Sequence, residues 1–154
     1  MTREAQIQDE LIYLIKTVIK KFRFYGLEFS KVERDYPIDR KKADVVVFKK
    51  GEGPFLFIET KRGGRRGRLF DPLDVSVVGQ VMGYAALYKK KHGYLVPYVA
   101  TTNGERIVVF KTPEDVENYI DLDAVERGEY QKAFKPGMYQ QLIQKYIIKD
   151  EEWI

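Results

Sequence analysis

The sequence predicts an α/β fold in which helices flank a mixed central sheet, in the order helix, three strands, helix, two strands and closing helices. Apolar residues recur every three or four positions through residues 5–24, which is the period of an amphipathic helix. Residues 43–48 are apolar and mostly β-branched except for Asp44, and residues 55–61 have apolar residues on both faces, as in a covered central strand. The 154 residues contain no internal repeat or linker. We therefore expect a single domain over residues 1–154, with residues 112–154 as a C-terminal helical extension.

The predicted elements follow from local patterns and from the residues that end them. Strands are predicted at residues 27–38, 43–48, 55–61, 97–103 and 106–111. Helices are predicted at residues 5–24, 72–91, 112–128 and 136–148. Asp71 and Pro72 are typical of a helix start, and Gly93 of a helix end. Asn103 and Gly104 are typical of the turn of a hairpin between the last two strands.

Composition excludes several kinds of site. The chain has no Cys and one His, so it has no disulfide framework, no thiol nucleophile and no multi-histidine metal centre. A metal ion would have to be held mainly by oxygen atoms. The formal net charge is +4, which attracts polyanions only weakly unless cations cluster locally. No apolar run approaches the length of about 18 to 20 residues that spans a bilayer, so we expect a soluble, cytoplasmic protein.

Charged residues stand where the predicted third strand ends. Glu59 and Lys61 are two residues apart, so they share one face of the strand, and Thr60 points to the other. Asp44 opens the preceding strand, and a hairpin through residues 51–54 would bring Asp44 beside Glu59. Two neighbouring carboxylates repel each other unless a cation lies between them, and a hard ion with oxygen ligands such as Mg²⁺ resolves that repulsion.

This Asp, followed after a hairpin by Glu-x-Lys, resembles the PD-(D/E)xK nuclease superfamily over about residues 5–111. Within it, "YPIDRKKADVVVF", "FIETKR", the helix carrying Gln80 and Tyr84, and "VATTNGERIVVF" look like the N-terminal nuclease domain of type I restriction enzyme R subunits and stand-alone relatives. The resemblance implies a restriction-endonuclease-like core, α-β-β-β-α-β. One departure is Ala43, which stands where the superfamily name has Pro.

The resemblance also implies roles for particular residues. Asp44, Glu59 and Lys61 match the catalytic set, and Gln80 matches an accessory active-site amide. Asp44 and Glu59 would be metal ligands for Mg²⁺ or Mn²⁺, joined by Glu10, which matches the first-helix acid that many relatives direct at the metal.

Simpler interpretations exist for each of these residues. Glu-x-Lys alone is also typical of a solvated strand end with an ion pair. Glu10 lies at the edge of its helix's apolar stripe, where acids are commonly just solvated. Gln80 and Tyr84 are four residues apart on a helix, a spacing that also suits a plain packing and hydrogen-bond pair.

The segment after the third strand contains the arginines that we expect to contact nucleic acid, namely Arg62, Arg65, Arg66 and Arg68. Tyr84 is the other expected nucleic-acid contact. The function predicted is metal-dependent hydrolysis of phosphodiester bonds, with DNA as the expected partner. A homodimer would let two sites cut two strands, and a larger restriction or repair complex is also compatible with the sequence. The alternatives are a non-cleaving nucleic-acid-binding module of such a complex, and a junction-resolving enzyme of the same fold.

Overall fold

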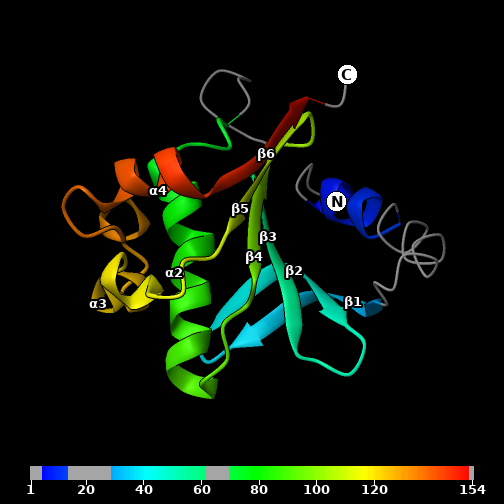
Figure 1. Ribbon diagram of the computed structural model, residues 1–154. Helices are drawn as coiled ribbons and strands as arrows, with labels where there is room; N and C mark the ends of the chain where they lie inside the picture. The colour runs from blue at the N-terminus through cyan, green and yellow to red at the C-terminus, as the bar shows by residue number, and fades with distance from the viewer. Residues whose placement is uncertain (1–4, 14–28, 62–69, 153–154) are drawn as a thin grey trace.

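The computed structural model describes residues 5–13, 29–61 and 70–152 and confirms the predicted fold class, a mixed α/β fold with helices on both faces of the sheet (Figure 1). The described residues form six strands: β1 (Phe29–Ile38), β2 (Lys41–Lys49), β3 (Pro54–Thr60), β4 (Tyr98–Thr102), β5 (Arg106–Lys111) and β6 (Ile147–Glu152). Helical segments in the same part of the chain are residues 5–13, α2 (Val75–His92), α3 (Leu122–Glu126), α4 (Met138–Tyr146) and the short 3₁₀ helices η3 (Val116–Asn118) and η4 (Tyr130–Lys132). None of these described helices is both long and apolar enough to cross a membrane.

The sheet has the strand order β1-β2-β3-β4-β5-β6. Strands β1, β2 and β3 form an antiparallel meander, while β3 and β4 are parallel and are joined through α2. Strands β4, β5 and β6 are again antiparallel. Because β2 and β3 are connected by a tight hairpin, the first residues of β2 and the last residues of β3 lie at the same end of the sheet.

Each face of the sheet packs against a different helix. The larger core lies on the α2 face, where Phe57, Val99 and Phe110 of the sheet meet the buried side of α2. The opposite face carries a smaller cluster in which Val45 and Ile58 pack with residues of the N-terminal helix (Figure 1). Successive β3 residues therefore alternate between α2 and the N-terminal helix.

The start of α2 differs from the prediction. Its N-cap is Asp74, whose carboxylate accepts from Ser76 N, and the helix begins at Val75. Asp71 instead accepts from Leu73 N at 2.9 Å, so its carboxylate is used in a turn before the helix. The predicted end is confirmed, because Gly93 caps the helix in a left-handed conformation with φ 65°.

The C-terminal extension is only partly helical. Residues 112–128 form η3 and α3 instead of one helix. Helix α4 ends at Tyr146, and β6 follows as an edge strand on β5. Residues 148–152 of β6 are exposed and mostly charged, so this segment lacks the alternation of apolar and polar residues that predicts a strand. Arg106 of β5 holds this strand by two hydrogen bonds to Asp150, at 2.7 and 2.6 Å.

Candidate metal and active site

The register of β2 and β3 places Asp44 and Glu59 in neighbouring strands at one end of the sheet. Val45 pairs with Ile58, so Asp44 and Glu59 stand at the next position of the antiparallel ladder. Glu59 is buried, with 2% of its surface exposed, and Asp44 is partly buried. The structure therefore brings together the two acids that the sequence predicted as metal ligands.

Thr60 fixes the carboxylate of Asp44. The backbone N–H of Thr60 donates to Asp44 Oδ2 at 2.9 Å, and the Thr60 hydroxyl donates to the same oxygen at 3.0 Å. Where the pairing of β2 and β3 ends, the Asp44 side chain thus replaces a backbone carbonyl as the acceptor for the Thr60 N–H. Two donors on one oxygen hold the carboxylate in a defined orientation and leave Oδ1 available to a further partner.

The N-terminal helix reaches this site through Gln8. Gln8 Nε2 donates to the Thr60 hydroxyl at 3.2 Å, and Gln8 Oε1 accepts from Arg34 at 3.0 Å. Arg34 also forms an ion pair with Asp9. The sequence analysis missed both Gln8 and Thr60. Strand alternation places Thr60 on the face away from Glu59, and it does not predict that the Thr60 backbone N–H and hydroxyl bind Asp44 of the neighbouring strand.

Glu10 does not join the two acids. Its side chain is exposed, and the acidic, His and Cys residues of the described ranges form no group of three that could hold a metal ion. The helix presents Gln8 toward Thr60, and residues two apart on a helix face different directions. The simpler interpretation of Glu10, a solvated acid, fits this position.

On the α2 face, Glu59 lies near a chain of hydrogen-bonded side chains. Gln80 Nε2 donates to the Tyr84 hydroxyl at 3.0 Å, and the hydroxyls of Tyr84 and Tyr130 are 3.0 Å apart. Burial, the hydrogen bond with Tyr130 and the negative charge of Glu59 all raise the pKa of Tyr84. The predicted pair of Gln80 and Tyr84 is therefore formed, on the side of the sheet to which Glu59 points.

Tyr84 does not lie where nucleic acid could contact it. Its side chain is 4% exposed, and its hydroxyl is occupied by Gln80 and Tyr130. The expectation of a direct nucleic-acid contact is corrected on this ground. The i+4 spacing from Gln80 reflects an internal hydrogen bond instead.

Lys61 continues the path of β3 beyond its last residue. Its backbone N–H donates to Thr102 O at 2.9 Å, so the chain stays paired with β4, and its side chain is partly buried. Continued pairing keeps the alternation of an extended strand, which puts Lys61 on the face of Glu59.

The end of β4 also anchors the chain that leads into α2. Asn103 Nδ2 donates to Phe70 O at 2.8 Å, and the Thr101 hydroxyl donates to Pro72 O at 2.6 Å. The same strand end therefore holds the residues on both sides of the basic segment. The four arginines predicted to contact nucleic acid lie within residues 62–69, outside the described residues.

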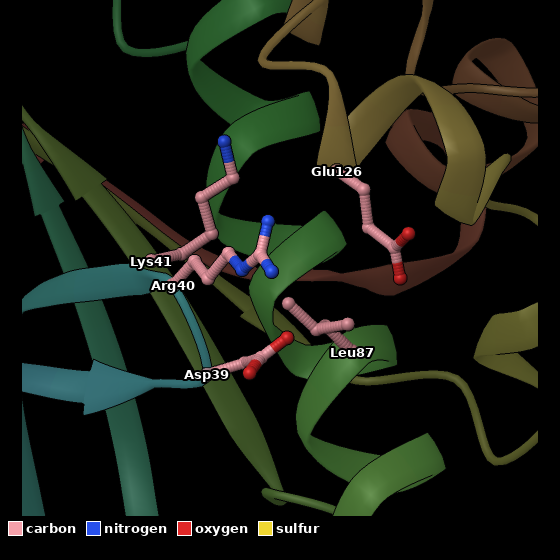
Figure 2. Close-up of a pocket in the computed structure, with 5 residues that line it drawn as sticks. All are labelled: Asp39, Arg40, Lys41, Leu87 and Glu126. Carbon is pink, nitrogen blue, oxygen red and sulfur yellow. The ribbon is translucent and has the colours of Figure 1, made fainter.

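A cavity of about 360 Å³ opens between the β1–β2 turn and α2 (Figure 2). It is lined by residues of the turn, of α2 and of α3, namely Asp39, Arg40, Lys41, Leu87 and Glu126. Asp39 is paired with Lys91 of α2 at 3.0 Å. Lys41 lies three residues before Asp44, and its ammonium is 5.8 Å from the ring centre of Tyr130. Sequence reasoning read "DRKK" only as a connection and did not find this cavity.

Comparisons with known proteins give one partial structural match. The chain matches no family model and no curated protein. Among solved structures it is similar to the type IIG restriction endonuclease BpuSI, with a TM-score of 0.47 and 17% identity. The match covers 84% of this chain and 15% of the BpuSI chain, so the chain spans a small part of that enzyme's length. A similarity of this extent does not indicate what chemistry this chain performs, which has to be argued from its own side chains.

The Thr60 hydroxyl should contribute measurably to stability. Thr60→Val keeps the shape of the side chain but removes the donor to Asp44 and the acceptor for Gln8. We expect the free energy of unfolding in urea to fall by about 1 to 3 kcal/mol, because buried polar partners lose their hydrogen bonds.

Thr112→Val is the matched control. The Thr112 hydroxyl is equally buried and has no hydrogen-bond partner among the described residues, so its removal should leave stability unchanged or slightly raised. Equal effects of the two substitutions would show that the Thr60 hydrogen bonds add nothing.

Proposed function

We propose that this protein is a metal-dependent nuclease that hydrolyses phosphodiester bonds in DNA. The observation that carries the proposal is the placement of Asp44 beside Glu59 at one end of the sheet, with Lys61 following on the face of Glu59. Two acids and a lysine gathered at a strand end are suited to bind a cation and an anionic phosphate together.

The donor set fits a hard divalent ion. Asp44 Oδ1 and the Glu59 carboxylate would hold Mg²⁺ or Mn²⁺, both of which prefer oxygen ligands. Since no third acid joins them among the described residues, water would complete the coordination, as is usual for Mg²⁺. When bound, such an ion supplies Lewis-acid chemistry and lowers the pKa of a water.

Lys61 would act on the phosphate and on the attacking water. Its ammonium carries three donors, so it can orient a water and stabilise the negative charge that develops on the phosphate. Gln80, on the α2 side, would position a water or a substrate oxygen with its amide. Glu59 is buried, and its negative charge acts on Tyr84, the hydrogen-bond partner of Gln80.

The basic segment after β3 would hold the nucleic acid. Arg62, Arg65, Arg66 and Arg68 follow the proposed catalytic strand directly, and arginine binds phosphate with paired hydrogen bonds. Lys61 and Phe70, which flank this segment in the sequence, are both hydrogen-bonded to the end of β4, next to the end of β3. Duplex, single-stranded and branched DNA are the substrates to compare, and a clear preference for branched DNA would indicate a junction-resolving enzyme.

Lys61→Met should separate catalysis from binding. The substitution keeps the apolar stem and removes the charge. We expect the single-turnover rate with Mg²⁺ or Mn²⁺ to fall about a hundredfold or more, because the transition state is deprived of a preorganised electrostatic interaction. DNA affinity in Ca²⁺, measured by fluorescence anisotropy, should change much less.

Lys49→Met is the control for this experiment, since Lys49 is also partly buried but ends β2 at the opposite end of the sheet. It should cleave at the parental rate. Parental cleavage by Lys61→Met would refute the role of Lys61. A parent that binds DNA but cuts no form of it would instead support the non-cleaving binding module.

Replacing Arg65, Arg66 and Arg68 together by Ala should weaken duplex binding and flatten its salt dependence. The log-log slope should fall by up to about 0.9 for each DNA phosphate that the variant no longer neutralises. A variant with Ala at Lys132, Lys135 and Lys145 has the same net charge and changes three lysines of the C-terminal extension. Equal slopes for the two variants would show that the basic segment does not contact the DNA backbone.

A further inference from the structure

We propose that Tyr130, which lies in the C-terminal extension, is a positioning residue that sets the orientation of the Gln80 amide through Tyr84. The proposal rests on the nuclease function proposed above. It makes residues outside the α-β-β-β-α-β core a working part of the site.

The hydrogen bonds define a direction along the chain of side chains. A tyrosine hydroxyl has one proton to donate and can also accept. Because the Tyr84 hydroxyl accepts from Gln80 Nε2, its own proton is available for Tyr130, whose hydroxyl is 3.0 Å away. With that proton directed to Tyr130, Tyr84 offers a lone pair to Gln80 and holds the NH₂ end of the amide.

The other end of the amide is thereby fixed as an acceptor. The NH₂ group and Oε1 of an amide point away from each other, so binding the NH₂ group to Tyr84 directs Oε1 away from Tyr84. Without the Tyr130 hydroxyl, Tyr84 can donate its proton to Gln80 Oε1, and the reversed amide becomes equally acceptable. Tyr130 would therefore decide which atom of Gln80 is presented to a water or substrate.

The fold holds Tyr130 closely against α2. A Cβ atom at Gly79 would lie 2.6 Å from the backbone oxygen of Tyr130, and one at Gly83 would lie 2.6 Å from Val125. These two glycines let the segment with α3 and η4 approach the helix directly beside Gln80 and Tyr84. The rings of Tyr84 and Tyr130 meet edge to face, with centroids 5.9 Å apart and an interplanar angle of 87°.

A second contact holds Tyr130 from the side of the sheet. Lys41 of β2 places its ammonium 5.8 Å from the centre of the Tyr130 ring, within the range of a cation–π interaction. Figure 2 shows Lys41 reaching from the β1–β2 turn along α2 at the edge of the cavity. Tyr130 is thus held between α2 and the strand that carries Asp44, which suits a residue that must keep one orientation.

The test compares Tyr130→Phe with Tyr146→Phe. Tyr146 is also partly buried and packs edge to face on Tyr119, with ring centroids 5.8 Å apart and an interplanar angle of 86°, and its interaction raises the pKa of Tyr119. The two substitutions therefore remove one hydroxyl from matched tyrosine pairs. Both variants should be destabilised to a similar extent, which thermal melting measures.

Only Tyr130→Phe should affect Gln80. We expect its single-turnover rate to fall about threefold to tenfold, the effect typical of removing one neutral hydrogen bond, with DNA affinity in Ca²⁺ unchanged. In a Gln80→Ala background the same substitution should have no further effect. A full additional decrease in that background, or an equal decrease of rate in Tyr146→Phe, would overturn the proposal.

A second readout does not depend on activity. The side-chain NH₂ resonances of Gln80, assigned by their disappearance in Gln80→Ala, should shift in Tyr130→Phe and stay in place in Tyr146→Phe. Unmoved resonances in Tyr130→Phe would overturn the positioning role even in an active enzyme. If the parent cleaves no DNA while the resonances shift, the nuclease function fails and the coupling between Tyr130 and the amide stands.

Discussion

The antiparallel register of β2 and β3 determines where each chemical group at the proposed site lies. Val45 opposite Ile58 puts Asp44 next to Glu59, keeps Glu59 on the α2 face and turns Thr60 toward Gln8. A slip of one residue would exchange the faces and move Glu59 to the side of the N-terminal helix. The packing of Phe57 against α2, and of Val45 and Ile58 against the N-terminal helix, opposes that slip. The hydrogen bonds from Thr60 to Asp44 fix the register where the pairing ends. Asp44, one of the two proposed metal ligands, therefore also helps to hold the register of the two strands.

Burial of Glu59 is the second constraint. Its side chain is 2% exposed, and burying a carboxylate costs free energy of folding unless a positive charge or hydrogen-bond donors lie beside it. A bound cation and Lys61 would supply that compensation at the same place where hydrolysis needs them. The opposite side of the site is built from neutral groups, in which Gln80, Tyr84 and Tyr130 are linked by hydrogen bonds. In this arrangement the charged residues would perform the chemistry, and the neutral chain would keep one amide in place.

Sequence reasoning found the parts of the site that depend on strand alternation and hairpin geometry. Asp44 and Glu59 could be paired because a tight hairpin joins two apolar strands, and the turn at Asn103 followed from its residue types. Thr60 and Gln8 could not be found, because the Gln8 amide and the Thr60 hydroxyl are 52 residues apart in the sequence. Thr60 in turn reaches Asp44 through its backbone N–H and its hydroxyl, which residue spacing does not predict. Tyr130 is 46 residues from Tyr84 and lies between the two helices predicted for the C-terminal extension, where no role was predicted. Strand β6 was missed because an exposed, charged edge strand lacks an apolar face. Glu10 was expected at the site because the resemblance does not say which side of the N-terminal helix faces the two acids.

Calorimetric titration with Mn²⁺ shows whether Asp44 and Glu59 together hold a divalent ion. Asp44→Asn keeps an oxygen that can accept from Thr60 and removes the charge, so the fold should survive while Mn²⁺ affinity falls about tenfold or more. Asp39→Asn is the control, because Asp39 is an exposed acid paired with Lys91 and lies outside the proposed metal site. We expect Asp39→Asn to bind Mn²⁺ with the parental affinity and Asp44→Asn to bind it much more weakly. Equal Mn²⁺ affinity in Asp44→Asn and the parent, or no Mn²⁺ binding by the parent, would contradict this expectation.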